Sequence, residues 1–193
     1  MAKSRKVCRT TFPHPRIIIF NFFFPLIFFF VSFYLPQLEA VTTGINTNTI
    51  ERSKFYGLIA FHRSAVVLNT FNSLESSNID KFIEQIRSLR PRRHLETSPA
   101  KALITATQLF PENSNNSKNI IFLVHNGENT DMVNESIEAI TKLSAKNISV
   151  FAIAGESFNE RTLLSYTKEE KGRILTGPKS ENLFLSTLDK ARN

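Results

Sequence analysis

The sequence predicts an α/β fold: a three-layer sandwich with a mostly parallel central sheet and one antiparallel hairpin at its edge. Short apolar runs that end in polar or glycine turns alternate with helical patterns, which is typical of parallel β-α-β units. The clearest unit has strands within residues 118–127 and 147–155, joined by a helical pattern over 131–146. Two further apolar runs, 55–61 and 65–68, are separated by only three residues, which predicts the hairpin.

The amino-terminal forty residues have the composition of a membrane-targeting segment. Five basic residues precede any acidic one, and a phenylalanine-rich, almost entirely apolar run extends from Ile17 to Leu35. This layout is typical of a secretory signal, and residues 37–40 end in a small residue suited to cleavage. The run is also close to the roughly 20 residues that span a bilayer, so an uncleaved signal-anchor is the alternative. Either route predicts a domain outside the cytosol, secreted or held by a single membrane pass.

These features divide the chain into a signal peptide or signal-anchor (1–40), a Thr- and Asn-rich linker (41–54) and one domain (55–193). The formal charge of +7 is concentrated in the leader. From residue 41 onward, 19 Lys and Arg against 16 Asp and Glu leave only +3, and this balance does not predict nucleic-acid binding. The only cysteine, Cys8, lies in the leader, so the predicted domain must rely on its apolar core rather than on disulfides.

Periodicity and capping residues place the helices of the domain. Apolar residues recur at helical spacing over 79–89, and a second helix is predicted from Pro99 to Leu109. Ser98 supplies a hydroxyl cap immediately before the proline of that helix.

In the crossover helix, one stripe contains Val133, Ile137, Ile140 and Ser144, and Met132, Ala139 and Leu143 flank it. Ser157 and Glu160 have the spacing of a capping box that opens a further helix. A short strand over 172–175 and a closing helix over 180–191 complete the predicted order.

Four segments together resemble the von Willebrand factor type A domain. They are the hairpin over 55–68, the segment Leu95-Glu-Thr-Ser-Pro-Ala-Lys-Ala-Leu103, the strand and turn over 120–127, and the strand over 148–155. The resemblance covers roughly residues 55 to 190. It implies a Rossmann-like sheet that binds a protein ligand at the carboxyl edge, commonly through a divalent cation.

The same resemblance indicates that the cation site is degenerate. Thr97 matches the family's loop threonine, Asn126 occupies the place of its final aspartate, and Gly127 preserves the turn. The Asp-x-Ser-x-Ser motif has no counterpart in the sequence, so the expected binding edge is Thr97, Asn126 and Gly127 without a metal ligand. No cofactor is predicted, although a weakly held cation such as Mg²⁺ stays open. Glu128 and Asp131 lie near the same edge and could supply carboxylates, but they have no matching partners in the sequence. Simpler roles also stay open: Thr97 as part of a helix cap, Asn126-Gly127 as a turn, and His125 as a packing residue.

The resemblance also implies a central first strand, and none of the usual kind precedes the hairpin. The chain is therefore expected to be truncated or divergent, with an incomplete fold. Three accounts are open: an incomplete gene product, direct pairing of the hairpin with the strand at Ile120, or Arg16 to Phe22 filling the gap without a signal function.

These features favour a non-enzymatic, extracellular, adhesion-like protein-binding module. A membrane-anchored or vestigial fragment without independent binding is the alternative, and residues 17–35 would be its inserted part. An enzyme on the same fold is disfavoured, because no phosphate loop, nucleophile elbow or catalytic triad is found. Asn115, Asn134 and Asn147 match the glycosylation pattern, and burial at the strand start is expected to block Asn147.

Overall fold

The computed structural model describes residues 16–22, 55–71, 78–88, 97–110, 119–128, 130–155 and 157–176, with the backbone alone for 16–22. These residues form a six-stranded sheet in the order β3-β2-β1-β4-β5-β6. The strands are β1 (Arg16–Phe22), β2 (Phe55–Phe61), β3 (Ala65–Asn69), β4 (Asn119–Val124), β5 (Ile148–Ala154) and β6 (Ile174–Thr176). Only the β2–β3 pair is antiparallel, which confirms the predicted mostly parallel sheet with one edge hairpin.

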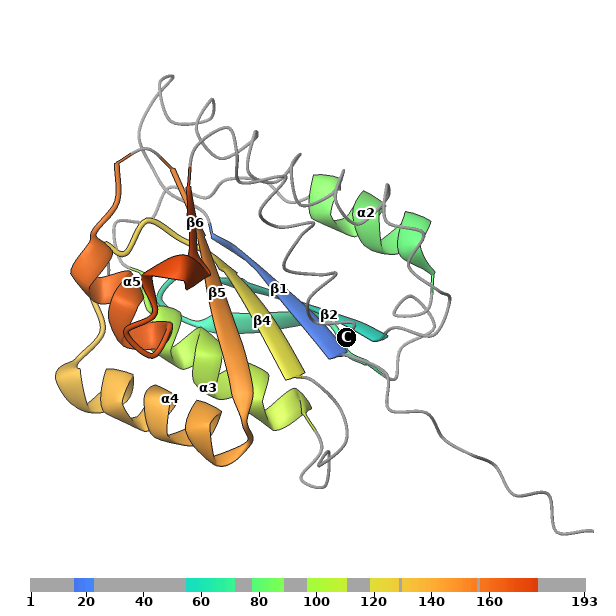
Figure 1. Ribbon diagram of the computed structural model, residues 1–193. Coiled ribbons are helices and arrows are strands. Elements are labelled where there is room, and N and C mark those ends of the chain that lie inside the picture. Colours follow the sequence, from blue (N-terminus) through green and yellow to red (C-terminus); the bar gives the residue numbers. More distant parts are fainter. Residues whose placement is uncertain are drawn as a thin grey trace, which may run out of the picture.

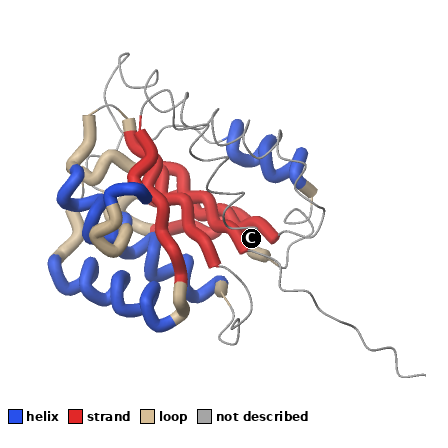
Figure 2. The backbone as a smooth tube through the Cα atoms, in the orientation of Figure 1, coloured by secondary structure: helices blue, strands red, loops and turns tan. Residues whose placement is uncertain are grey.

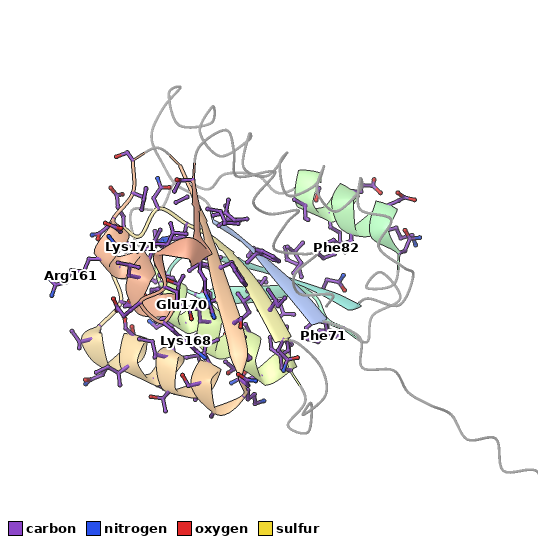
Figure 3. All side chains as sticks on the ribbon, in the orientation of Figure 1. Phe71, Phe82, Arg161, Lys168, Glu170 and Lys171 are labelled. Atoms are coloured by element: carbon purple, nitrogen blue, oxygen red, sulfur yellow. The ribbon has the colours of Figure 1, made fainter. Side chains whose placement is uncertain are left out.

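Helices cover both faces of this sheet (Figures 1 and 2). One face carries α3 (Pro99–Leu109), α4 (Val133–Ala145) and α5 (Glu160–Tyr166), and the other carries α2 (Ile79–Ser88). The main buried cluster joins small residues of α3, such as Ala102 and Ala106, to Ile121 and Leu123 of β4. On the other face, Phe82 of α2 is fully buried and lies on the side of its helix nearest the sheet (Figure 3).

The expectation that the fold lacks its first strand is wrong. Residues 16–22 form β1, which pairs in parallel with β2 on one side and β4 on the other. Ile18, for example, lies in register with Gly57 and Ile121. A strand at this place satisfies the two inner edges that β2 and β4 would otherwise expose, and unpaired edges of that kind favour aggregation. Of the three accounts, the structure follows the one in which Arg16–Phe22 fill the gap.

The predicted apolar stripe of α4 is also partly wrong. Ala139 and Leu143 are its buried residues, whereas Val133 and Ile137 are exposed. The inward face is therefore rotated from the predicted stripe: Ala139 and Leu143 join the main buried cluster, and Ile140 alone of the three apolar stripe residues packs against it. Tertiary packing selected this face over the more apolar one.

Two local predictions near the ends of β5 need correction. The cap of α5 is Asn159, whose side chain accepts from the N–H of Thr162 at 3.2 Å, so Ser157 is not the capping residue. Asn147 is exposed rather than buried, with φ of 50° in the turn that precedes β5. Asparagine tolerates this left-handed conformation better than most residues.

Several predictions fall on residues outside the described ranges. They are the linker over 41–54, the acceptor Asn115, the closing helix over 180–191 and the leader apart from β1. Among the helices that the structure does describe, none has the length and apolar character needed to cross a bilayer.

Candidate functional site: the carboxyl edge of the sheet

His125 follows the fully buried strand β4 at the carboxyl edge of the sheet, and it is a packing residue. Its ring is 1% exposed and lies 5.9 Å from the ring of Phe61, centroid to centroid. Its Nδ1 accepts the N–H of Gly127 at 2.8 Å. Burial lowers the pKa of His125 from 6.5 to about 3, and a backbone hydrogen bond at Glu128 opposes this only in part. The imidazole is therefore neutral at physiological pH.

Asn126 and Gly127 join the end of β4 to the segment between β5 and α5. The side-chain oxygen of Asn126 accepts the N–H of Gly155 at 3.2 Å. The backbone carbonyl of Asn126 accepts the N–H of Asn159 at 2.7 Å. Gly127 has φ of 81°, and a Cβ added there would lie 2.5 Å from the Asn159 carbonyl oxygen. This position therefore requires glycine for both its backbone conformation and the close approach.

Thr97 joins the start of α3 to the loop after β4. Its hydroxyl donates to the Glu128 carbonyl at 2.5 Å, and its own carbonyl accepts the N–H and the hydroxyl of Thr130 at 2.8 and 3.0 Å. Thr97 is 1% exposed. The cap of α3 is the neighbouring Ser98, as predicted, with its oxygen accepting the N–H of Lys101 at 3.4 Å.

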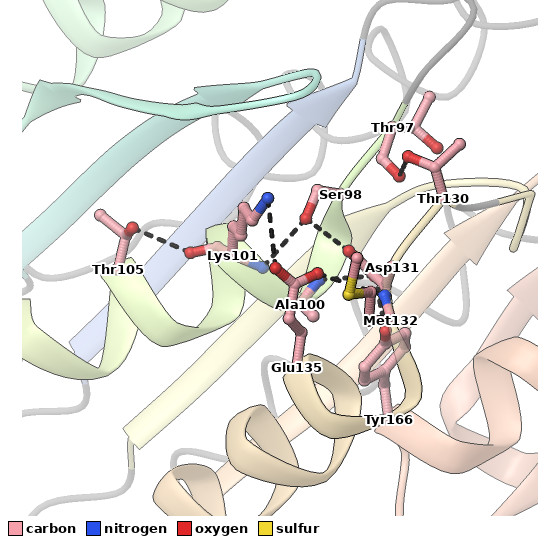
Figure 4. Close-up of polar contacts among 10 residues, drawn as sticks. All are labelled: Thr97, Ser98, Ala100, Lys101, Thr105, Thr130, Asp131, Met132, Glu135 and Tyr166. Atoms are coloured by element: carbon pink, nitrogen blue, oxygen red, sulfur yellow. Dashed lines mark hydrogen bonds and ion pairs between the residues drawn. The ribbon is translucent and has the colours of Figure 1, made fainter.

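Asp131 lies at this edge, as the sequence indicated, but its role as a link between helices was not predicted (Figure 4). Its half-buried carboxylate accepts hydrogen bonds from the Ser98 hydroxyl, from the N–H of Ala100 at 2.9 Å and from the Tyr166 hydroxyl at 2.8 Å. These partners come from the start of α3 and the end of α5. The N–H groups and dipole at the start of a helix favour a carboxylate there, so Asp131 links three elements through one charge.

The start of α4 is fixed by a second carboxylate. Glu135 accepts the N–H of Met132 at 3.2 Å and pairs with Lys101 of α3 at 3.2 Å. The Met132 hydrogen bond, followed by Lys101, lowers the pKa of Glu135. The loop between β4 and α4 is thus attached to α3 at both of its ends.

The structure brings the three predicted edge residues to one place but uses their polar atoms inside the fold. Asn126 is half-buried, and Thr97 and Gly127 are buried. The side chains exposed to a partner at this edge belong instead to Glu128, Thr130, Ser157 and Asn159. Across the described ranges, no group of three or more His, Cys, Asp or Glu side chains could hold a metal ion.

Fold and edge together define an open α/β domain that presents loops at the carboxyl ends of parallel strands. The chain belongs to the von Willebrand factor type A domain family, whose sequence profile matches residues 35–189. Domains of this family mediate protein interactions. Strand β1 lies before the matched range, although it occupies the centre of the sheet. No curated protein matches the chain in sequence.

Solved structures share the fold at low sequence identity. Proximal thread matrix protein 1 from the mussel byssus superposes with a TM-score of 0.70 at 17% identity, over 92% of this chain and 47% of that protein. The chain therefore spans about half the length of that relative. BatB from Bacteroides thetaiotaomicron gives a TM-score of 0.75 at 14% identity, covering 92% and 98%. The manganese-loaded TRAP protein of Plasmodium vivax gives 0.72 at 14%, covering 89% and 71%.

Proposed function

We propose that the chain is a non-enzymatic, extracellular protein-binding module of the adhesion type whose carboxyl edge is held in place without a metal ion. The observation that carries the proposal is the use of Thr97, Asn126 and Asp131 in hydrogen bonds within the fold. The family membership supports protein binding, and a structural neighbour from the mussel byssus supports a place outside the cell. The apolar run over 17–35 does not itself carry this part of the proposal, because Arg16–Phe22 lie in the sheet.

The residues present do not fit the divalent cation that some structural neighbours hold. The TRAP protein is manganese-loaded, and proximal thread matrix protein 1 is known with a zinc-occupied MIDAS motif. Here the Thr97 hydroxyl donates to a backbone carbonyl, and the Asn126 oxygen accepts from Gly155. Residues 23–27, which follow β1, read Phe-Phe-Pro-Leu-Ile and offer no side-chain oxygen. Magnesium requires about six oxygen ligands, including carboxylates, to replace its hydration shell.

Hydrogen bonds perform the organising role that a cation would otherwise perform. Asp131 fixes the loop after β4 against α3 and α5, and Asn126 fixes the same loop to the segment after β5. The exposed side chains on these loops are then presented on a rigid support. A preformed surface loses less conformational entropy on binding, which favours recognition.

The localisation and modification predictions belong to the same proposal. Because β1 occupies the centre of the sheet, the proposal requires export without cleavage after residue 40. Asn134 and Asn147 are exposed, and this supports them as glycosylation acceptors in an exported chain. A fragment without independent binding is the second candidate. The edge residues favour the binding module over this candidate, because a fragment without a function has no need of a preorganised edge.

Metal titration tests the first half of the proposal. Calorimetry with Mg²⁺ and Mn²⁺ on the full chain is expected to show no saturable binding, and Asn126→Asp is expected to create none, because the oxygen ligands after β1 are still missing. Micromolar affinity in either protein would refute the metal-independent edge.

Capture from an extracellular protein extract tests the second half. The full chain on beads is compared with Glu128→Lys/Asn159→Lys at the edge and with Glu84→Lys on the exposed side of α2 as the matched control. Binding is expected to survive a chelator and the control substitution and to be lost with the edge substitutions. Loss on chelation, or equal capture by all three proteins, contradicts the proposal.

A further inference from the structure

The amino-terminal half of α4 exposes three large apolar side chains. Met132, Val133 and Ile137 are 73%, 75% and 57% exposed, and we refer to them as the α4 apolar patch. Val133 and Ile137 are four residues apart and therefore lie on one face of the helix. The inward contacts of α4 are made by other residues, chiefly Ala139 and Leu143. The fold thus does not need this patch for its core.

The position of the patch relates it to the most apolar stretch of the sequence. The patch begins at the start of α4, which follows the carboxyl end of β4. Strand β1 is parallel to β4 and adjacent to it, so its last residue, Phe22, lies at the same edge of the sheet. The chain continues from Phe22 into residues 23–35, which are mostly Phe, Leu and Ile and lie outside the described ranges. The described part of β1 therefore stops at this edge where the most apolar segment begins.

While β1 is paired in the sheet, the apolar residues that follow it are too few to span a bilayer. With Arg16–Phe22 in the sheet, thirteen residues remain from 23 to 35. Even as a helix they would extend about 20 Å, at 1.5 Å per residue. The hydrocarbon core of a bilayer is about 30 Å thick. Contact with the surface of a bilayer has no such length requirement, and it would bring this edge of the domain close to the lipid.

The charges around the patch indicate which lipid surface suits it. Glu135 pairs with Lys101 at 3.2 Å, and Glu138 pairs with Lys142 at 2.7 Å. The neighbouring cations are thus already matched by carboxylates and offer no excess positive charge to anionic headgroups. Attraction by burial of apolar side chains remains, and it does not depend on headgroup charge.

We propose that the α4 apolar patch docks on the surface of a lipid bilayer, with Met132, Val133 and Ile137 entering the boundary between headgroups and acyl chains. This docking brings the carboxyl edge of the sheet close to the membrane surface, so a protein ligand bound at that edge would lie at the same surface. The proposal does not rest on the protein-binding function, since it concerns a different set of side chains.

A tryptophan reporter tests the proposal directly, because the chain contains no tryptophan. Val133→Trp is placed in the full chain, and Val66→Trp, at a 51% exposed position of the edge strand β3, is the matched control. The chains are mixed with phosphatidylcholine vesicles with and without brominated acyl chains. Emission from the Val133→Trp chain is expected to shift to the blue and to be quenched about twofold or more, because only a side chain at the boundary meets the acyl chains. Emission from the Val66→Trp chain is expected to stay unchanged.

Serine variants measure the contribution of the patch to binding. Met132→Ser/Val133→Ser/Ile137→Ser is expected to weaken vesicle partitioning by about tenfold or more, whereas Val66→Ser/Leu68→Ser leaves it unchanged. Addition of phosphatidylserine is expected to leave the quenching of the Val133→Trp chain unchanged.

Three outcomes would overturn the membrane proposal. They are vesicle binding that leaves the emission of the Val133→Trp chain unchanged, a shift of that emission only on self-association, and a shift only in response to a protein in an extract. If the chain captures no protein from the extract while the vesicles still quench the emission of the Val133→Trp chain, only the protein-binding function is refuted.

Discussion

The centre and the edge of the sheet contain strands of similar composition that experience different surroundings. Strand β1 contains Ile17-Ile18-Ile19, and β3 contains Val66-Val67-Leu68. The former has a partner strand on each side, whereas the latter lies at the end of the sheet with all three side chains exposed. Strand β3 is also short, and its pairing with β2 carries a register shift near Leu68, features that discourage pairing with another chain. Similar β-propensity therefore forms a strand paired on both sides at one place and a short edge strand at the other.

The largest expected effect separates these two strands. Ile18→Pro removes a ladder donor and is expected to destabilise the fold by about 3 kcal/mol or more, because β1 is paired on both sides. Leu68→Pro, at the register shift of the edge strand, is expected to cost much less, because proline is tolerated at edges and bulges. Urea unfolding of both variants checks this. Equal losses, or a neutral Ile18→Pro, would mean that β1 does not stabilise the sheet.

The next effect concerns the neutral, buried imidazole of His125 at the end of central strand β4. Its folded pKa of about 3 lies below the ordinary value of 6.5, so between these values the unfolded chain binds a proton that the folded chain does not. The stability that this group contributes is complete above pH 6.5 and is lost as the pH falls toward 3. The free energy of unfolding should fall by up to about 1.4 kcal/mol per pH unit from this group.

Comparison with His125→Gln isolates that contribution. Urea unfolding at about pH 4 to 7 should give a shallower decline for the variant, by roughly one proton. NMR should show no titration of the His125 ring near its ordinary pKa of 6.5. An identical pH dependence in both proteins would disprove the assignment.

The smallest effect compares two glycines. Gly127 follows the inner strand β4, and Gly172 lies just before the edge strand β6. Gly127→Ala forces a positive φ on alanine and places its Cβ against the Asn159 carbonyl, so a loss of about 1–3 kcal/mol is expected. Gly172→Ala, which meets nothing within 4 Å, is expected to be neutral within about 0.5 kcal/mol. Thermal unfolding distinguishes the two. A neutral Gly127→Ala would show that the turn can move away from α5.

Sequence reasoning succeeded where the signal was local. The β4-α4-β5 unit, the hairpin and the Ser98 cap of α3 were all predicted from periodicity and spacing. It left β1 as one of three open accounts, because a strand inside a long apolar run has the same composition as a membrane segment. It placed Asp131 near the carboxyl edge but did not predict its structural role, because its hydrogen-bond partners lie 31 to 35 residues away.

The sequence alone therefore determined the alternation of strands and helices, the family and the Asn-Gly turn after β4, since each depends on neighbouring residues. Tertiary structure alone decided that Arg16–Phe22 complete the sheet, which face of α4 turns inward and where Asp131 binds. These outcomes depend on contacts between distant segments, whose free energy depends on geometry that local composition does not encode.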